Sequence, residues 1–298
     1  MLHMMLDVYK CNNPKFNNML SINNLINDIC TQLKLKAIAP PVIVPFYYGK
    51  VADDDGISAF VLLEGGHFTI HTFYKRRCAF VDLLFDEYEG GYLIKMMKKR
   101  ASVYKNGQLV GDPVRINDWE IDRNCKNAFV KIDQINKFKR GVEKSFLGFG
   151  PHYFVTAQCK KPLSLQGVYD ILDHMPRKAH MTPITRPFVV YDQIDEPEFL
   201  SGIIVIAESH ISIHYNIAER KLFFDMFTCR PLPSEVMKKA FFDMFADTID
   251  ESSMIDALIE RGQDHVYTIK TKSKSTIRSE WTKNTWIENI YETHPHAK

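Results

Sequence analysis

Three side chains in the second half of the chain could together make a covalent cofactor. Ser209, His214 and Cys229 bring a hydroxyl, an imidazole and a thiol into one short stretch. A serine hydroxyl can attack the carbonyl group of the residue before it, here Glu208, and convert the peptide bond into an ester. Elimination across the serine Cα–Cβ bond then cuts the chain, and hydrolysis leaves a pyruvoyl group. A neutral histidine is a suitable base for this elimination near pH 7.

A pyruvoyl group in turn predicts decarboxylation of a substrate that carries an amine. Its carbonyl forms a Schiff base with the amine and accepts the electrons that remain when CO2 leaves, as pyridoxal phosphate does elsewhere. The resulting carbanion needs a proton, and a thiol such as Cys229 can donate it. These residues therefore predict a self-processing enzyme in which Ser209 is the precursor of the cofactor.

A metal site is not expected from the same stretch. On a strand, His210 and His214 share one face and lie about 13 Å apart, which is too far to bind one ion together. The β-branched residues Ile211 and Ile213 favour a strand over a helix, and the sequence contains no H-E-x-x-H.

The chain contains two copies of one unit. Segment 58–86 aligns without gaps with segment 201–229, and Ser201, His210 and His214 each follow their counterparts by 143 residues. Each copy is expected to hold a short strand, an amphipathic helix and further apolar strands, and a helix over 234–245 closes the second copy. Such units bury one sheet face against helices. The prediction is an α+β fold in which two sheet-plus-helix repeats form a four-layer αββα sandwich.

The repeat also sets the expected domain limits. Residues 1–110 form a degenerate repeat without catalytic function and residues 151–271 form the catalytic repeat. Residues 111–150 connect them, with linker and surface helix expected over 119–147, and residues 272–298 are a basic tail. A hairpin is expected around Asn106-Gly107.

The two copies differ where chemistry is expected. Gly66 stands in the place of Ser209, and Asp86 stands in the place of Cys229, whereas the counterparts of Ser201, His210 and His214 are kept. A purely structural motif has little reason to lose its nucleophiles in one copy. We therefore expect one working site and one half that serves as scaffold.

Composition narrows the class of protein further. The 298 residues are 45% hydrophobic and 25% charged, with a net charge of +2, which is typical of a globular protein and does not indicate a nucleic-acid or membrane partner. The six cysteines show no C-x-x-C spacing and are expected to be reduced. No signal peptide or membrane span is expected near the N-terminus or elsewhere. We expect a cytoplasmic protein.

The stretch LSGIIVIAESHISIH, followed by DMFTC, resembles the S-adenosylmethionine decarboxylase family, the pyruvoyl-dependent enzymes of polyamine and spermidine synthesis. The resemblance covers both copies and is closest to the fused form of the family. It implies that Ser209 becomes the pyruvoyl group, that Glu208 ends a β chain, and that the remaining residues form an α chain. It further implies that His214 is the processing histidine, that Ser201 assists processing, and that Cys229 is the catalytic proton donor.

Two positions depart from the family pattern. The family commonly reads Thr-Trp-Pro-Glu after the processing histidine, but here Ala218 occupies the glutamate position and Glu219 lies one place further on. Asp195 stands where the family has an adenine-stacking phenylalanine. Phe199 or Tyr215 is a candidate to replace the lost contacts with substrate.

These departures leave two substrate classes open. S-adenosylmethionine is the substrate that the family implies. Arginine or ornithine is the alternative, because the acidic run over 192–198 could bind a guanidinium or ammonium group, although the run can equally be a solvated loop.

A function of another class is a non-catalytic subunit that activates a second decarboxylase. A serine or thiol hydrolase is disfavoured because the sequence has no G-x-S-x-G nucleophile elbow. The expected partners are a small-molecule substrate, the β and α chains of one precursor, and a second copy in a possible homodimer.

Overall fold

The computed structural model divides the chain into two compact units, Met1–Gln134 and Ile135–Lys298, which are described separately. The described residues are 2–9, 14–46, 55–75, 78–85, 114–116, 119–121, 126–131, 150–193, 197–207, 209–229 and 232–261.

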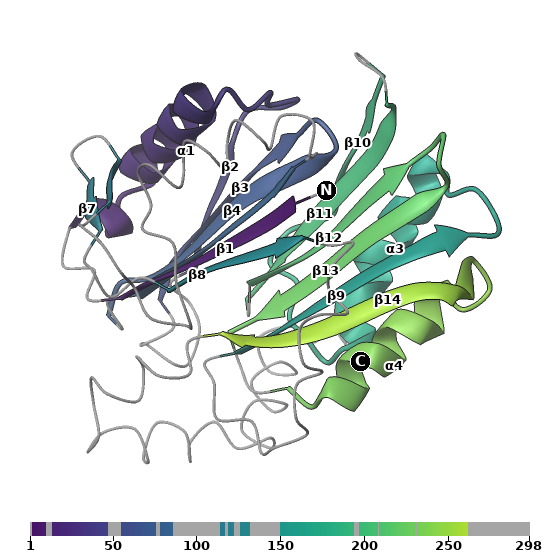
Figure 1. The fold of residues 1–298 in the computed structure, drawn as a ribbon. Coiled ribbons are helices and arrows are strands. Elements are labelled where there is room, and N and C mark those ends of the chain that lie inside the picture. Colours follow the sequence, from purple (N-terminus) through teal and green to yellow (C-terminus); the bar gives the residue numbers. More distant parts are fainter. Residues whose placement is uncertain are drawn as a thin grey trace. The chain divides into compact units, whose positions relative to one another are not determined.

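The first unit is built on a six-stranded antiparallel sheet with the strand order β2-β3-β4-β5-β1-β8 (Figure 1). Its strands are β1 (Leu2–Tyr9), β2 (Val42–Phe46), β3 (Gly56–Leu63), β4 (Gly66–Phe73), β5 (Cys78–Phe85) and β8 (Lys126–Lys131). Helix α1 (Met19–Leu33) follows a short 3-10 helix, η1 (Pro14–Asn17), and β6 (Val114–Ile116) pairs with β7 (Trp119–Ile121).

The second unit repeats this topology. Its sheet has the order β10-β11-β12-β13-β9-β14, so each strand has a counterpart at the same place in the first sheet. The strands are β9 (Gly150–Cys159), β10 (Phe188–Asp192), β11 (Phe199–Ile206), β12 (Ser209–Asn216), β13 (Lys221–Thr228) and β14 (Ile249–Arg261). Helices α3 (Leu165–Lys178) and α4 (Ser234–Phe245) lie on one face of this sheet (Figure 1).

Alternation along the strands decides which side chains meet the helices. Ile211, Ile213 and Tyr215 of β12 belong to the hydrophobic core that includes residues of α3 and α4. The alternate residues His210, Ser212 and His214 point to the opposite face, and they are buried although they are polar. The second sheet therefore has one apolar face under its helices and an opposite face, here called the polar face, on which β12 places buried polar side chains among apolar residues of the neighbouring strands.

Helix starts follow the capping chemistry of the sequence. Ser164 accepts a hydrogen bond from the backbone N–H of Gly167 at the start of α3, at 3.0 Å. Asn18 does the same for Ser21 at the start of α1, at 2.9 Å. Ser21, which matches Ser164 in the repeat, therefore lies inside the first turn of α1. The two helices are capped by different residue types, Asn18 and Ser164.

The α+β class and the repeat are confirmed by the two antiparallel sheets with their helices. Helix 234–245 is also confirmed with the expected limits. The interpretation of the connecting region was wrong in part, because Lys126–Lys131 forms β8 and pairs with β1. The lysines at its two ends suit an edge strand. The stacking of the sheets into four layers stays a prediction, and residues 106–107 and 272–298 lie outside the described residues.

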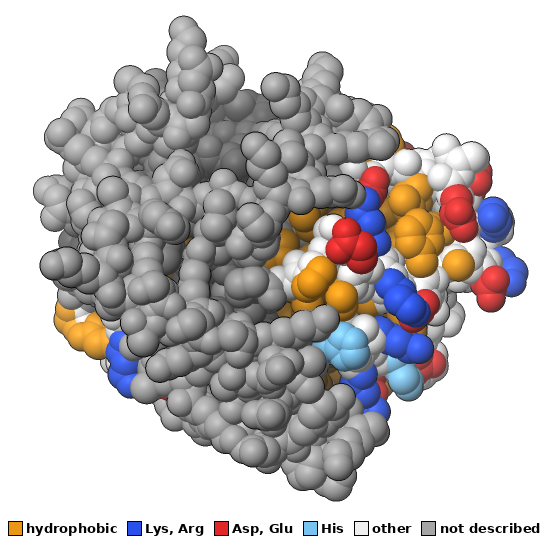
Figure 2. Space-filling model, turned by 90° about the horizontal axis from the view of Figure 1, so that it is seen from below, with side chains coloured by type: hydrophobic (Ala, Val, Ile, Leu, Met, Phe, Trp, Pro, Cys, Tyr) orange, Lys and Arg blue, Asp and Glu red, His pale blue; other side chains and the backbone are white. Residues whose placement is uncertain are grey.

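The described part of the face in Figure 2 carries charges of both signs. Acidic and basic side chains lie next to each other on the described part of the face in Figure 2. Within the described residues, no helix is both long enough and apolar enough to span a bilayer.

Candidate active site

Ser209 is the first residue of β12 and follows the tight connection from β11. Its Cα lies opposite Ile206 on β11 and opposite Thr228 on β13. The side chain is 1% exposed, and within the described residues its Oγ has no hydrogen-bond partner. A buried hydroxyl without a partner is costly. Because no hydrogen bond holds this hydroxyl elsewhere, it is available to attack the carbonyl group of the preceding residue.

The backbone of Ser209 is unusual as well. Its φ is +152°, a positive value that residues with a side chain rarely adopt because Cβ crowds the backbone. Strain of this kind is found in functional sites where the surrounding structure enforces it. The counterpart position holds Gly66, preceded by Gly65 with φ of +64°. The first unit therefore has glycine at the serine position, and its positive φ falls one residue earlier, at Gly65.

Cys229 follows directly after β13 and is 1% exposed. Thr228 faces Ser209 across the sheet, and Cys229 is the next residue after Thr228. The cysteine forms no disulfide bond. The strand register thus brings together the two residues that the sequence assigned to cofactor formation and proton donation.

Ser201 and His214 form a cross-strand pair between β11 and β12. They are direct partners in the register, both side chains are fully buried, and Ser201 Oγ lies 2.8 Å from His214 Nδ1. Ser58 and His71 form the same pair in the first unit, also at 2.8 Å. The pair is therefore present both in the unit with the serine and in the unit without it.

The position of His214 does not suit direct contact with Ser209 in the second unit. The two residues are five apart on one strand, which corresponds to roughly 16 Å along β12, and their side chains alternate to opposite faces. The extended strand expected from the sequence therefore separates the two groups. A processing role of His214 stays a prediction, and the identical pair at Ser58 and His71 is the natural comparison for it.

The expected substrate contacts lie in different surroundings. Phe199 of β11 is 3% exposed and shares the polar face with Ser201, two residues along the strand. Tyr215 instead lies in the core beneath the helices, and burial raises the pKa of its hydroxyl. This location on the helix side does not favour a contact of Tyr215 with substrate at the polar face.

Glu219 lies exposed in the turn between β12 and β13, where its backbone N–H donates to Asn216 Oδ1 at 2.8 Å. The turn shows no preformed contact of its carboxylate with the polar face. Asp195 and Glu208 lie outside the described residues.

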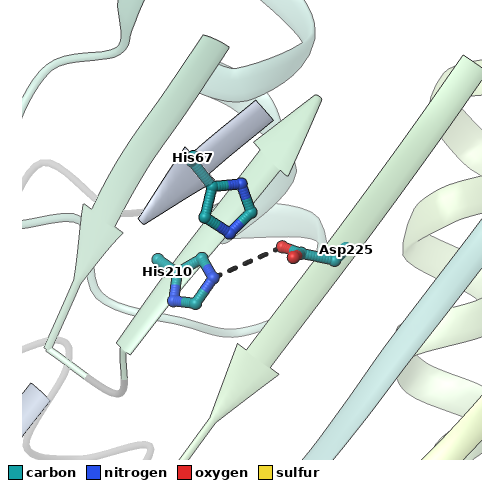
Figure 3. Close-up of side chains that lie close together, drawn as sticks. All are labelled: His67, His210 and Asp225. Atoms are coloured by element: carbon teal, nitrogen blue, oxygen red, sulfur yellow. Dashed lines mark ion pairs between the residues drawn. The ribbon is translucent and has the colours of Figure 1, made fainter. Parts of the chain in front are cut away.

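Sequence reasoning assigned no role to a buried polar cluster on the same face, which consists of His152, His210, Ser212 and Asp225. Asp225 Oδ1 lies 3.4 Å from His210 Nε2, the ion pair drawn in Figure 3. Ser212 Oγ donates to Asp225 at 3.0 Å, and His152 Nε2 lies 3.6 Å from the second carboxylate oxygen. The available signal was a lone aspartate inside the apolar strand sequence FFDMF.

A model of the S-adenosylmethionine decarboxylase family matches residues 2–99 and 157–262, more than half of the chain. This chain belongs to that family. One matched segment lies in each unit, so the tandem form expected from the repeat is confirmed. Membership of the S-adenosylmethionine decarboxylase family implies a decarboxylase.

Among solved structures, the chain is similar to the adenosylmethionine decarboxylase from Aquifex aeolicus VF5. The two sequences are 19% identical and the TM-score is 0.31, over 39% of this chain and 92% of that chain. A search of the curated proteins found no match.

Proposed function

We propose that this chain cleaves itself between Glu208 and Ser209 and decarboxylates S-adenosylmethionine with the pyruvoyl group formed from Ser209, a step that serves spermidine synthesis. The observation that carries the proposal is the state of Ser209. It is buried, its hydroxyl has no partner within the described residues, and its backbone has a positive φ. These properties fit a residue that reacts with its own chain.

The described residues fit a pyruvoyl group at this position. The group would stand at the start of β12 and would supply an electron sink for loss of CO2. The thiol of Cys229 belongs to the residue after Thr228, which faces Ser209 in the register, and can hold the proton that the product requires. Phe199 pairs with Asn216 at the end of the β11–β12 hairpin away from Ser209, so the register does not favour a contact of its ring with the group at Ser209.

The first experiment is the intact mass of the purified protein under denaturing conditions. We expect a chain of 208 residues that ends at Glu208 and a chain of 90 residues that starts with the pyruvoyl group. Ser209→Ala should give one uncut chain, because the attacking hydroxyl is missing. Two fragments from Ser209→Ala would disprove the assignment of the serine.

The histidine that acts in processing is identified by parallel substitutions in the two Ser–His pairs. If His214 is the base for elimination, His214→Ala should remain uncut while His71→Ala is cut at the normal rate. Because the ester precedes elimination, the uncut variant should also be split by hydroxylamine. Normal cutting of His214→Ala together with loss of cutting in His71→Ala would transfer the processing role to the pair in the first unit.

A second substrate class is supported by Asp192. This residue of the acidic run is 4% exposed and lies opposite Phe199 in the register of β10 and β11, at the end of the sheet away from Ser209, so it can bind only a part of the substrate that extends to that end. Such a group favours the guanidinium of arginine or the ammonium of ornithine.

Release of labelled CO2 from S-adenosylmethionine, arginine and ornithine separates the candidates. Asp192→Asn should lower turnover of the basic amino acids if either is the substrate. A cut chain that releases CO2 from none of the three would favour the non-catalytic activator.

A further inference from the structure

Asp225 is a buried carboxylate in the middle of β13, and its side chain is 2% exposed. Burial of a carboxylate is costly unless hydrogen bonds and positive charge compensate for the lost water. Ser212 donates a hydrogen bond to Asp225 Oδ1, and His210 and His152 lie within ion-pair distance. The carboxylate therefore joins groups from the two strands that flank β13.

The imidazole rings of this cluster are held by packing. The His152 ring lies 5.1 Å from the ring of Phe227 and 4.1 Å from that of Phe154. It meets the His210 ring edge to face at 6.0 Å. Rings fixed in this way cannot turn freely, so the contacts to Asp225 also fix the backbone positions of His152 and His210.

The cluster reaches the cleavage position through the chain itself. His210 is the residue after Ser209, and Ser212 is two residues further on the same face. Ser209 has no side-chain hydrogen bond of its own within the described residues, and its positive φ must be imposed by neighbouring residues. Ser212, which donates a hydrogen bond to Asp225, and His210, whose Nε2 lies 3.4 Å from the same carboxylate, supply that constraint.

We propose that Asp225 is a positioning residue for self-cleavage. It holds His210 and Ser212, and through them it keeps Ser209 in the strained conformation in which the hydroxyl attacks the carbonyl group of Glu208. The bond that forms joins Ser209 Oγ to that carbonyl carbon, the bond that breaks is the peptide C–N bond, and the hydroxyl proton ends on the nitrogen. This role deepens the proposed function and rests on it.

The first unit provides a matched control. Asp82 occupies the position of Asp225, and His67 and Thr69 occupy those of His210 and Ser212. All three are fully buried, but Gly66 replaces the serine. Asp225→Asn and Asp82→Asn therefore make the same change in two similar surroundings, and only the neighbouring strand of Asp225 begins with a serine.

The test measures the rate of self-cleavage in freshly made full-length chain by intact mass. We expect Asp225→Asn to be cut at least about tenfold more slowly than the wild type and Asp82→Asn to be cut at the wild-type rate. Hydroxylamine should not split the Asp225→Asn chain, because the acyl shift itself is slowed and no ester accumulates. Far-UV circular dichroism and thermal melting check that each variant is folded.

His210→Gln tests the same contact from the other strand and replaces Asp225→Asn if that variant does not fold. The double variant should be no slower than the slower single variant, because both changes break one interaction. The proposal is overturned if Asp225→Asn and His210→Gln are cut at the wild-type rate, if Asp82→Asn is slowed equally, or if ester accumulates. A wild type that remains uncut would instead refute the proposed function.

Discussion

Ser209 combines features that would be selected against in an ordinary strand residue. Its hydroxyl is buried without a partner within the described residues, and its backbone has a positive φ. Each of these features costs stability. A residue that is consumed in the reaction can carry such costs, because they apply only to the precursor and are removed when the bond before Ser209 is cut.

The strain at Ser209 can be measured in chains that are not cut. Glycine tolerates a positive φ, whereas alanine does not, so Ser209→Gly should melt a few degrees higher than Ser209→Ala, on the order of 1 kcal/mol. Thermal melting by circular dichroism measures the difference.

Thr228, the cross-strand partner of Ser209, provides the control because its φ is not positive. In the Ser209→Ala background, Thr228→Gly should melt lower than Thr228→Ala, since glycine weakens a strand. Equal melting temperatures for the two Ser209 variants would show that this residue is not strained.

Cys229 allows formation of the cofactor to be separated from its use. Cys229→Ala should still be cut, because the thiol takes no part in the acyl shift or the elimination. Its turnover should fall by about 10²-fold or more, since general acids contribute rate factors of this size. Intact mass reports the cut, and release of labelled CO2 reports turnover.

Cys159→Ala is the matched control for loss of a buried thiol, and its turnover should change little. Normal turnover in Cys229→Ala would remove the cysteine as proton donor.

At the scale of elements, the β3–β4 and β11–β12 hairpins share their register but differ in the space beside the residue that starts the second strand. A Cβ atom added to Gly66 would lie 2.0 Å from the backbone oxygen of Leu84. Backbone atoms cannot move aside as a flexible side chain can. The first hairpin is therefore closed around a glycine, and it has no room for a serine without rearrangement of β5.

Gly66→Ser should consequently fail to create a second cleavage site. The added side chain should lower the free energy of unfolding by about 1–3 kcal/mol through overpacking, and the Ser209 site should still be cut. Urea denaturation and intact mass measure the two effects.

Gly167→Ala is a control in helix α3, where the added Cβ would meet only the Ser164 side chain, at 3.2 Å, and its destabilisation should be smaller. A new fragment that begins at residue 66 would contradict the prediction.

At the scale of the whole chain, the internal repeat explains what could be predicted from the sequence. Periodicity placed the helix over 234–245 and the β13 strand, and comparison of the copies isolated Ser209 and Cys229. Residues with long-range partners were less visible. Strand β8 lies far along the chain from its partner β1, and the contacts of Asp225 with His152 depend on the pairing of β13 with β9.

Burial of Cys30 in the first unit and of Cys159 in the second links the stability of the chain to pH. Burial raises the pKa of Cys30 in the first unit and of Cys159 in the second from 9.0 to about 11. Between pH 9 and 11 the unfolded thiols have lost their protons while the folded thiols still keep them. Unfolding then releases protons, so the free energy of unfolding falls as pH rises, by up to about 1.4 kcal/mol per pH unit for each thiol. Below pH 8 their contribution is complete and constant.

Urea denaturation of the uncut Ser209→Ala chain at pH 8, 9, 10 and 10.5 tests this dependence. Replacement of both Cys30 and Cys159 by alanine should flatten the decline above pH 9, and each single replacement should remove about half of that effect. Other groups, such as lysines, contribute equally to both chains and cancel in the comparison. Parallel curves for the parent and the double variant would mean that neither thiol keeps its proton in the folded state. Curves that differ in the Cys30 variant alone would assign the effect to the first unit.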